Sequence, residues 1–314
     1  MNSQDIKNAI SGVLVVDKPV GMTSHDVVEA IRRGTGIRRA GHTGTLDPRA
    51  SGVLVILIGP AVRLSEYVSA SDKRYQAIIR LGSSTDTFDA DGKFVQSNQP
   101  VNVTEEQFEK ILKNFEGEIE QTPPPYSAVK VGGRRAYDMA RQGEEVELAP
   151  RKIQVHHLEV LEWAPPEVVV DVHCSSGTYV RSLANDIGVQ LGTGAYLVGL
   201  RRTKSGRFSL RDATPLRKLQ EAFQAGNWYQ YLIPAAEALA DWPAVELNPD
   251  EVEEVRHGHR VKMAADAPTT EMVRGVSAAG ELIALMIPAA NPEDGSPEWQ
   301  PKKVFFTSEA KGEN

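Results

Sequence analysis

One loop of the sequence concentrates the residue types that chemistry on a bound substrate needs. It runs Gly41-His-Thr-Gly-Thr-Leu-Asp-Pro-Arg-Ala-Ser-Gly52 and leads into an apolar segment at 53–58. The loop has neither the Gly-Lys-Ser/Thr ending of a P-loop nor the strand–GxGxxG–helix order of a dinucleotide site, so it matches neither nucleotide motif. What remains is one carboxylate, Asp47, held by a following proline between two glycine-bearing turns.

Asp47 has two interpretations at this point. An aspartate before a proline commonly stabilises a turn, and that role is the default for an isolated Asp-Pro. A carboxylate presented by a rigid loop can instead act as a nucleophile or a general base, and its ionised form is then required. The loop alone does not decide between them.

Four further segments carry polar, aromatic and cationic residues in a fixed order along the chain. They are 13–26, which contains Lys18-Pro19; Lys73-Arg-Tyr75; Cys174–Ala184, which contains Thr-Tyr-Val-Arg; and 200–208. With Gly41–Pro48, this ordered set resembles the bacterial tRNA pseudouridine synthases of the TruB family, which modify uridine 55 in the TΨC arm. The resemblance spans about the first 215 residues, and its specific parts are Gly41–Pro48 and Cys174–Ala184.

The resemblance implies an enzyme whose catalytic aspartate is Asp47. Formation of pseudouridine breaks the N1–C1′ glycosidic bond, turns the uracil and rejoins it through C5. Arg181 matches the family's arginine that pairs with the aspartate, and a guanidinium at hydrogen-bonding distance favours the ionised carboxylate and fixes its rotamer. Taken alone, Arg181 would be a surface arginine on a helix.

The resemblance also implies a pocket for a flipped base. A base in a folded loop is inaccessible, so it must be extruded and held by stacking and edge contacts, and stacking contributes roughly 1–3 kcal/mol per base. Tyr75 corresponds to the stacking aromatic, Tyr179 and Leu200 to two further pocket residues, and His42 to a histidine that meets the nucleotides around the target. Without the resemblance, Tyr75 and Leu200 would be ordinary strand residues and His42 a loop histidine.

The distribution of charge permits an RNA partner despite a net charge of −7. Residues 241–314 carry 7 Lys/Arg against 14 Asp/Glu, and the first 240 residues are neutral overall. Four arginines lie within 31–39 and four cations within 200–208. A phosphate backbone responds to such local positive potential, although most charge runs are solvated faces. Lys18, Lys130 and Arg202 are assigned to phosphate contacts, which position the RNA without choosing the base.

Composition limits the other possibilities. Hydrophobic residues make up 41% of the 314 and charged residues 25%, which is typical of a soluble globular protein. No apolar run approaches the roughly 20 residues that cross a bilayer, and the N-terminus lacks the order of a signal peptide, so a cytoplasmic location is expected. Cys174 is the only cysteine, and the isomerisation implies no metal and no cofactor. His257-Gly-His259 is the one histidine pair at metal-ligand spacing.

The pattern of strands and helices predicts an α/β (α+β) fold. The two kinds of element are intermixed without a βαβ repeat, which favours a central mixed, largely antiparallel sheet, and the resemblance implies the pseudouridine-synthase fold. Residues 82–92 are expected to form an exposed loop. Strands are expected at 12–16, 53–58, 75–81, 151–161, 167–174 and 194–201, and helices from Thr23 or Ser24 to just before Gly34, at 61–70, from Thr104 and at 180–191.

Near Ala240 the composition becomes acidic, and a second domain is expected. We predict a catalytic domain at 1–240 and a small β-rich domain at 241–314 that ends in an acidic tail, Glu309–Asn314. The resemblance likens the second domain to a PUA domain, an RNA-binding β-barrel.

Three functions remain open from the sequence. The first is a stand-alone tRNA pseudouridine synthase, a monomer that acts on the TΨC arm and needs no protein partner. The second is a tRNA-binding or tRNA-folding module whose catalysis is incidental. The third is the related catalytic subunit of guide-RNA-directed complexes, which the short acidic tail disfavours.

Overall fold

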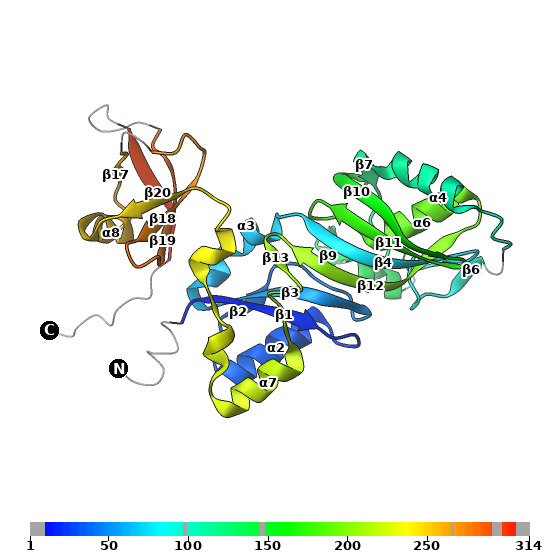
Figure 1. Ribbon diagram of the computed structural model, residues 1–314, viewed down its shortest axis with the longest axis horizontal. Coiled ribbons are helices and arrows are strands. Elements are labelled where there is room, and N and C mark those ends of the chain that lie inside the picture. Colours follow the sequence, from blue (N-terminus) through cyan, green and yellow to red (C-terminus); the bar gives the residue numbers. More distant parts are fainter. Residues whose placement is uncertain are drawn as a thin grey trace. The chain divides into compact units, whose positions relative to one another are not determined.

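The computed structural model describes residues 10–96, 99–127, 129–142, 144, 148–264, 267–290 and 297–305. The chain divides into two compact units (Figure 1). The first unit comprises residues 1–48, 53–69 and 207–314, and the second comprises 49–52 and 70–206. Within the ranges given above, no helix is both long and apolar enough to cross a membrane.

The first unit is built on a small mixed sheet. Strand β1 lies between β14 and β3; it pairs with β14 in parallel and with β15 antiparallel, and β2 pairs antiparallel with β3. The elements before the second unit are β1 (Gly12–Lys18), α2 (Ser24–Thr35), β2 (Ala40–His42), β3 (Ala50–Ile58), a 3-10 helix (Gly59–Leu64) and α3 (Ser65–Ser69). Those after it, up to residue 240, are β13 (Phe208–Ser209), β14 (Thr214–Pro215), α7 (Leu216–Ala225), a 3-10 helix (Trp228–Tyr231), β15 (Ile233–Pro234) and a 3-10 helix (Ala235–Leu239).

Helix α2 begins as expected and ends later than expected. Thr23 and Asp26 form a capping box at its N-terminus. The predicted end before Gly34 is wrong, because the helix continues to Thr35 and ends at Gly36, whose φ is 71°. Gly34 is inside the helix for a packing reason: a Cβ there would lie 2.1 Å from Cδ2 of Phe223 on α7. Figure 1 shows the two helices side by side.

The second unit is built on an antiparallel sheet in the order β12-β4-β11-β10-β7. The first residues of β3 also belong to this unit, and they pair in parallel with β12. Its elements as far as β9 are β4 (Lys73–Leu81), β5 (Ser84–Thr85), β6 (Phe94–Gln96), α4 (Glu105–Leu112), a 3-10 helix (Lys113–Phe115), β7 (Gly117–Gln121), β8 (Lys130–Val131) and β9 (Arg134–Arg135). The rest are α5 (Ala136–Arg141), β10 (Arg151–Ala164), β11 (Glu167–Cys174), α6 (Val180–Leu191) and β12 (Ala195–Ser205).

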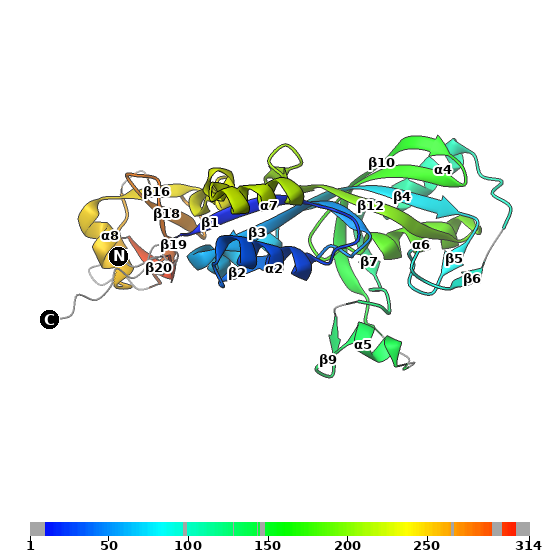
Figure 2. The same ribbon diagram turned by 90° about the horizontal axis from the view of Figure 1, so that it is seen from below.

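Helix α6 packs on one face of this sheet. A Cβ on Gly188 would lie 2.1 Å from the backbone nitrogen of Ala195 in β12, so only glycine permits this approach. Ala195 is opposite Leu81 of β4, and Leu81 has the same parity as Tyr75. The helix therefore covers the face of β4 that carries Tyr75. Figure 2 shows the β9–α5 segment standing away from the sheet.

The C-terminal part of the first unit is a five-stranded sheet in the order β16-β18-β19-β20-β17. Trp299 is fully buried in its own apolar cluster, while Leu282, Leu285 and Phe305 belong to the core that also contains Val13 of β1. The expected acidic tail, 309–314, lies outside the described residues. The elements are β16 (Ala244–Leu247), α8 (Pro249–Arg256), β17 (Val261–Lys262), β18 (Val273–Ser277), β19 (Leu282–Pro288) and β20 (Glu298–Val304).

The predicted fold class is confirmed, as are the predicted strands and the helices at 104 and 180. The mixed, largely antiparallel character follows directly from the pairings above. The expectation of an exposed loop at 82–92 is wrong. Apart from Asp91, every residue of this segment is buried or half-buried, because its polar groups bond one another and neighbouring elements.

Candidate active site

Asp47 is half-buried and lies in the first unit, in the loop between β2 and β3. The loop is fixed on both sides of the carboxylate. Just before it, the hydroxyl of Ser24 donates to the carbonyl of Leu46 at 3.0 Å and accepts from the Leu46 amide at 2.8 Å. Just after it, the amide of Gly21 donates to the carbonyl of Pro48 at 2.8 Å. The backbone of Asp47 is therefore positioned by the start of α2 and the turn before it.

Lys18 is buried and also holds the backbone of the Asp47 loop. Its side chain is fully inaccessible to solvent, and its ammonium donates to the carbonyls of Met22 at 2.6 Å, Pro19 at 2.9 Å and Pro48 at 3.4 Å. A phosphate contact needs an accessible ammonium, so this burial argues against the role expected for Lys18. The ammonium instead joins the end of β1 to the Asp47 loop.

His42, the last residue of β2, is half-buried and pairs across the sheet with Ile56 of β3. Its Nδ1 accepts a long hydrogen bond, 3.4 Å, from the amide of Gly44. His42 and Asp47 thus belong to one loop of the first unit, stiffened at both ends.

Tyr75, Leu200 and Arg202 lie together in the second unit. In the antiparallel pair of β4 and β12, Tyr75 is opposite Arg202 and Ala77 is opposite Leu200. Directly opposed residues share a face of the sheet, so these side chains lie on the face that α6 covers. Leu200 is half-buried, Tyr75 is 8% exposed and Arg202 only 2% exposed. Arg202 is therefore buried beside Tyr75, which argues against the phosphate contact expected for it.

A cation beside Tyr75 is buried as well. Burial, and after it the charge of Arg202, lowers the pKa of Lys73 to about 8. Lys73 is 6% exposed and donates to the carbonyl of Ser71. Lys73 of β4 and Arg202 of β12 therefore place two buried basic side chains beside Tyr75, on the same face of the sheet.

Tyr179 marks the start of α6. Gln121, at the end of β7, brackets its backbone: the side-chain carbonyl accepts from the Tyr179 amide at 2.8 Å, and the side-chain amide donates to the Tyr179 carbonyl at 3.0 Å. The guanidinium of Arg151 lies over the ring, 4.6 Å from its centroid.

Arg181 lies in the first turn of α6 and is 8% exposed. Its Nη1 donates to Oδ2 of Asp89 at 2.9 Å, and its Nη2 donates to the carbonyl of Tyr126 at 3.2 Å. The ion pair is mostly buried, with 10% of the Arg181 side chain and 14% of the Asp89 side chain exposed. Two anchors in two different segments therefore fix the plane of the guanidinium.

Asp89 is in turn part of a small network in the second unit. Its Oδ1 accepts from the Asp91 amide at 3.0 Å and from the hydroxyl of Thr87 at 2.6 Å. The carboxylate of Asp91 accepts from Nε of Arg49. Sequence reasoning missed Asp89, because the Ser-, Thr-, Asp- and Gly-rich composition of the segment is also that of a solvated loop. In the structure, the segment is marked by Phe88, a non-glycine residue at a φ of 64°. The sequence does not reveal this angle.

The predicted site residues divide between the units. The first holds Lys18, His42 and Asp47, and the second holds Tyr75, Tyr179, Arg181, Leu200 and Arg202. Lys130 lies in β8, opposite Arg135 of β9; its side chain is outside what the structure describes.

Comparison with known proteins identifies the family. Residues 32–180 match the model of the TruB family pseudouridylate synthase N-terminal domain. Residues 181–240 match the tRNA pseudouridylate synthase B C-terminal domain, and 242–306 match the tRNA pseudouridine synthase II C-terminal model. The chain is 44% identical to tRNA pseudouridine synthase B of Arthrobacter sp. (strain FB24) over 292 residues, which cover 89% of this chain and 94% of the relative. This chain belongs to the TruB family of pseudouridine synthases.

Other relatives agree with this assignment. The tRNA pseudouridine synthase B of Symbiobacterium thermophilum is 47% identical over 252 residues, 79% of this chain and 82% of the relative. Membership of the TruB family makes the protein an enzyme that isomerises uridine to pseudouridine, as the sequence predicted.

Two solved structures of the same fold come from larger assemblies. A chain of a Cbf5–Nop10–Gar1 complex superposes with a TM-score of 0.73 at 28% identity, covering 97% of this chain and 88% of that one. A chain of an H/ACA ribonucleoprotein bound to a substrate RNA containing 2′-deoxyuridine gives a TM-score of 0.72 at 27% identity, covering 98% and 88%. The predicted pseudouridine-synthase fold is thereby confirmed.

Proposed function

We propose that this TruB family enzyme isomerises uridine 55 in the TΨC loop of tRNA, with Asp47 as the catalytic carboxylate and Arg181 as its cationic partner. The observation that carries the assignment is the fixed guanidinium of Arg181. A buried arginine that is held only to balance a charge needs one carboxylate, whereas this one is oriented by both Asp89 and the Tyr126 carbonyl. Such double anchoring suits a group that must meet a reacting carboxylate in one geometry.

A residue close to Asp47 in the sequence belongs to the network around Arg181. Only Pro48 separates Asp47 from Arg49 in the sequence. Arg49 bonds to Asp91, whose backbone amide bonds to Asp89, the partner of Arg181. Arg49 is thus part of the network that holds Arg181.

Tyr75 and Leu200 supply the proposed walls of the base pocket, and Tyr179 its third side. They come from neighbouring strands and from the start of α6. Their spacing is therefore set by a sheet and a helix, which are more rigid than a loop. The target uridine is flipped into this pocket and stacks on Tyr75. His42, which shares a loop with Asp47, meets nucleotides beside the target.

The chemistry needs one ionised carboxylate. Asp47 either attacks the sugar or base as a nucleophile or removes the C2′ proton as a base. In both routes the N1–C1′ bond breaks, the uracil turns in its pocket, C5 bonds to C1′ and loses its proton, and N1 gains a proton. Asp47 is regenerated either by leaving the covalent adduct or by returning the C2′ proton. Atoms are conserved, so the reaction consumes no co-substrate.

Burial changes the proposed set of phosphate contacts. Lys18 and Arg202 are buried, and we reassign Lys18 to holding the Asp47 loop. Lys130 keeps its proposed phosphate role. We also propose that the enzyme acts in the cytoplasm as a monomer without an obligatory protein partner, with a catalytic domain at 1–240 and an RNA-binding domain at 241–314.

Mapping pseudouridine in tRNA tests the substrate. In cells that lack this gene product, uridine should persist at position 55 while pseudouridines elsewhere remain, and the wild-type gene should restore the modification. A tRNA transcript with cytidine at position 55 serves as the control in vitro and should receive no pseudouridine. Normal modification of position 55 in the deletion strain would refute the assignment.

A role in tRNA folding is a second candidate, because flipping a base out of the TΨC loop must disturb the tertiary contacts of the tRNA. It predicts that variants of basic surface residues alter the folding rate of tRNA, and that changes at Asp47 do not. Both activities can belong to one protein, so measuring them in the same variants separates them.

A further inference from the structure

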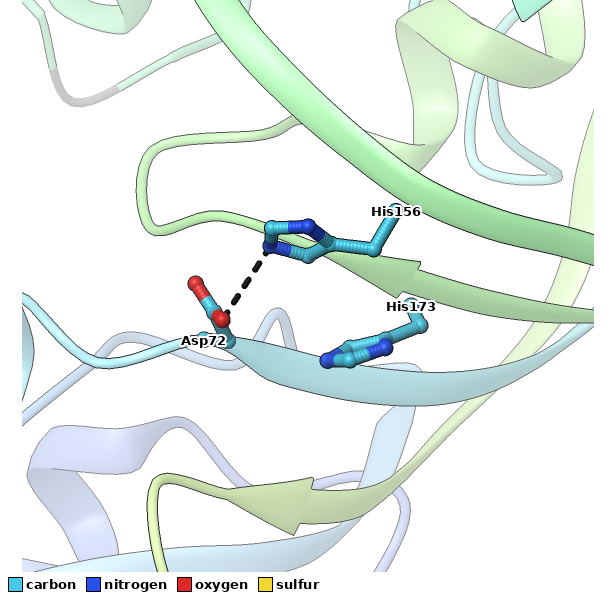
Figure 3. Close-up of side chains that lie close together, drawn as sticks. All are labelled: Asp72, His156 and His173. Atoms are coloured by element: carbon cyan, nitrogen blue, oxygen red, sulfur yellow. Dashed lines mark ion pairs between the residues drawn. The ribbon is translucent and has the colours of Figure 1, made fainter. Parts of the chain in front are cut away.

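Three side chains in the second unit gather their ligand atoms at one point, away from the residues assigned above. Asp72 precedes β4, His156 is in β10 and His173 is in β11 (Figure 3). Nε2 of His156 lies 3.1 Å from Oδ2 of Asp72, and the two imidazole rings have centroids 4.7 Å apart. One ligand atom of each residue lies within 4.8 Å of those of the other two.

A β-bulge brings the two histidines together. Along the β10–β11 pair, Val155 is opposite Cys174 and His157 is opposite His173, so His156 is the extra residue on its strand. In a regular strand the side chains of His156 and His157 would point to opposite faces. The bulge turns His156 toward His173, and bulges are enriched where a strand re-aims a side chain. The sequence pattern alone could not show this cluster, since the three residues are distant in the chain.

The cluster is on the face of the sheet opposite the proposed base pocket. His173 is directly opposite Arg74 of β4, and Arg74 alternates with Tyr75. The side chains of His156 and Asp72 are 33% and 50% exposed, so an ion can enter from solvent. None of the three residues has a role in the proposed isomerisation.

The donors suit one class of ion. Two imidazole nitrogens and one carboxylate oxygen form a set that Zn²⁺ and other borderline divalent transition metals bind. Donors on one tetrahedral zinc lie about 3.3 Å apart when Zn–N is about 2.05 Å. The ligand atoms spread over up to 4.8 Å. Binding therefore requires Asp72 and His156 to rotate toward the ion, and both side chains are exposed enough to do so.

The surrounding charges oppose binding only in part. Arg74 is paired with Asp171, whose two oxygens lie 2.8 and 3.0 Å from its Nε, and Lys204 adds a further positive charge near His173. These neighbours predict moderate affinity.

We propose that Asp72, His156 and His173 form a binding site for a divalent transition-metal ion, and that the physiological ion is zinc. The ion takes three protein ligands and leaves a coordination position for water. It links the start of β4 to β10 and β11, and thereby stabilises the second unit.

Zinc titration of the full-length protein, with any affinity tag removed, tests this site. Calorimetry and thermal unfolding are recorded for the wild type, His156→Gln, His173→Gln and Asp72→Asn. The matched control is His157→Gln, the next residue on the same strand, whose ring faces Glu116. Circular dichroism establishes that each variant is folded. Cobalt substitution of the wild type reports the ligand set by its visible spectrum and needs no variant.

We expect one zinc ion per chain with micromolar affinity, a melting temperature that rises with zinc, and a cobalt spectrum typical of four or five ligands. Each histidine variant should bind at least about tenfold more weakly, and His157→Gln should bind like the wild type. Absence of stoichiometric binding at about 100 µM zinc would overturn the proposal. The proposal would also be overturned if His156→Gln and His173→Gln bound zinc as tightly as the wild type, which would place the ion elsewhere, or if the cobalt spectrum were purely six-coordinate.

Discussion

At the scale of single residues, the contact between Arg181 and Asp89 explains how the proposed partner of Asp47 is held. The side chains are at least 86% buried and meet at 2.9 Å. Removing one partner of such a pair leaves the other charge buried without compensation. Arg181 donates one hydrogen bond to Asp89 and another to the Tyr126 carbonyl. Arg181→Lys is therefore not a conservative change, since an ammonium cannot reproduce two hydrogen bonds directed by one rigid plane.

Asp89→Asn should therefore lower both stability and activity. We expect the free energy of unfolding to fall by about 1–3 kcal/mol and the rate of pseudouridine formation to fall by about 10²-fold, because a misplaced Arg181 no longer orients the reacting carboxylate. Urea unfolding and single-turnover assays measure the two effects.

The control is Glu167→Gln, which breaks the exposed pair of Glu167 with Arg80 on the same sheet. Exposed pairs contribute about 0–1 kcal/mol, so this variant should retain wild-type activity. An equal loss of activity in both variants would show that the Arg181–Asp89 pair does not position a catalytic group.

Lys18 provides a test between positioning and phosphate binding. Lys18→Met removes the three carbonyl contacts, so we expect kcat to fall while the salt dependence of tRNA binding is unchanged. A phosphate contact would instead reduce the slope of log K against log salt by about 1. Filter binding at several salt concentrations distinguishes the two, and a reduced slope with normal kcat would restore the original assignment.

At the scale of elements, the position of α6 depends on a glycine. A Gly→Ala change in a helix ordinarily stabilises it by up to about 1 kcal/mol. Gly188→Ala should do the opposite and destabilise by about 1–3 kcal/mol, because the added methyl meets the backbone of Ala195. It should also lower activity, since α6 carries Arg181.

Ala184→Gly in the same helix is the comparison for Gly188→Ala. It removes a methyl group without creating a clash, and so reports the cost of ordinary helix propensity and packing. Chemical unfolding gives the free energy of unfolding of both variants, and their losses relative to the wild type are compared. A Gly188→Ala protein as stable as the wild type would mean that α6 does not approach β12 as closely as described.

Much of the element structure was predictable from local patterns. The capping boxes at Thr23 and Thr104, and the left-handed glycine at 192, are local signals that the structure retains. Gly34 misled the prediction of the end of α2, because its reason is the ring of Phe223 about 190 residues away in sequence. Likewise, the bulge at His156 depends on pairing with β11, which no local pattern encodes.

The candidate site was predictable to a different degree. Asp47, Tyr75, Tyr179 and Arg181 came from a family resemblance, since each residue type alone favours an ordinary structural role. Asp89 could not be found, because an ion pair that joins residues 92 positions apart leaves no periodic trace. The burial of Lys18 is hidden for the same reason: lysine is nearly always exposed, and only tertiary contacts retain this one inside.

At the scale of the whole molecule, the C-terminal sheet cannot be removed without consequence. Leu282, Leu285 and Phe305 belong to the apolar core that contains Val13 and Val55 of the first unit. Truncation after Ala240 should therefore expose that core and lower the melting temperature, in addition to any loss of tRNA affinity. Thermal unfolding of residues 1–240 beside the full chain checks this, and an unchanged melting temperature would show that the C-terminal part folds independently.

The central claim concerns the carboxylate of Asp47, and Asp47→Asn tests it most directly. The change retains the size and loop position of the side chain and removes only its charge. On an unmodified tRNA transcript, under single-turnover conditions, we expect tRNA binding within about twofold of the wild type and pseudouridine formation reduced by at least about 10²-fold. Asp212→Asn, at an exposed turn, should behave like the wild type. Conversion by Asp47→Asn at the wild-type rate would contradict the account.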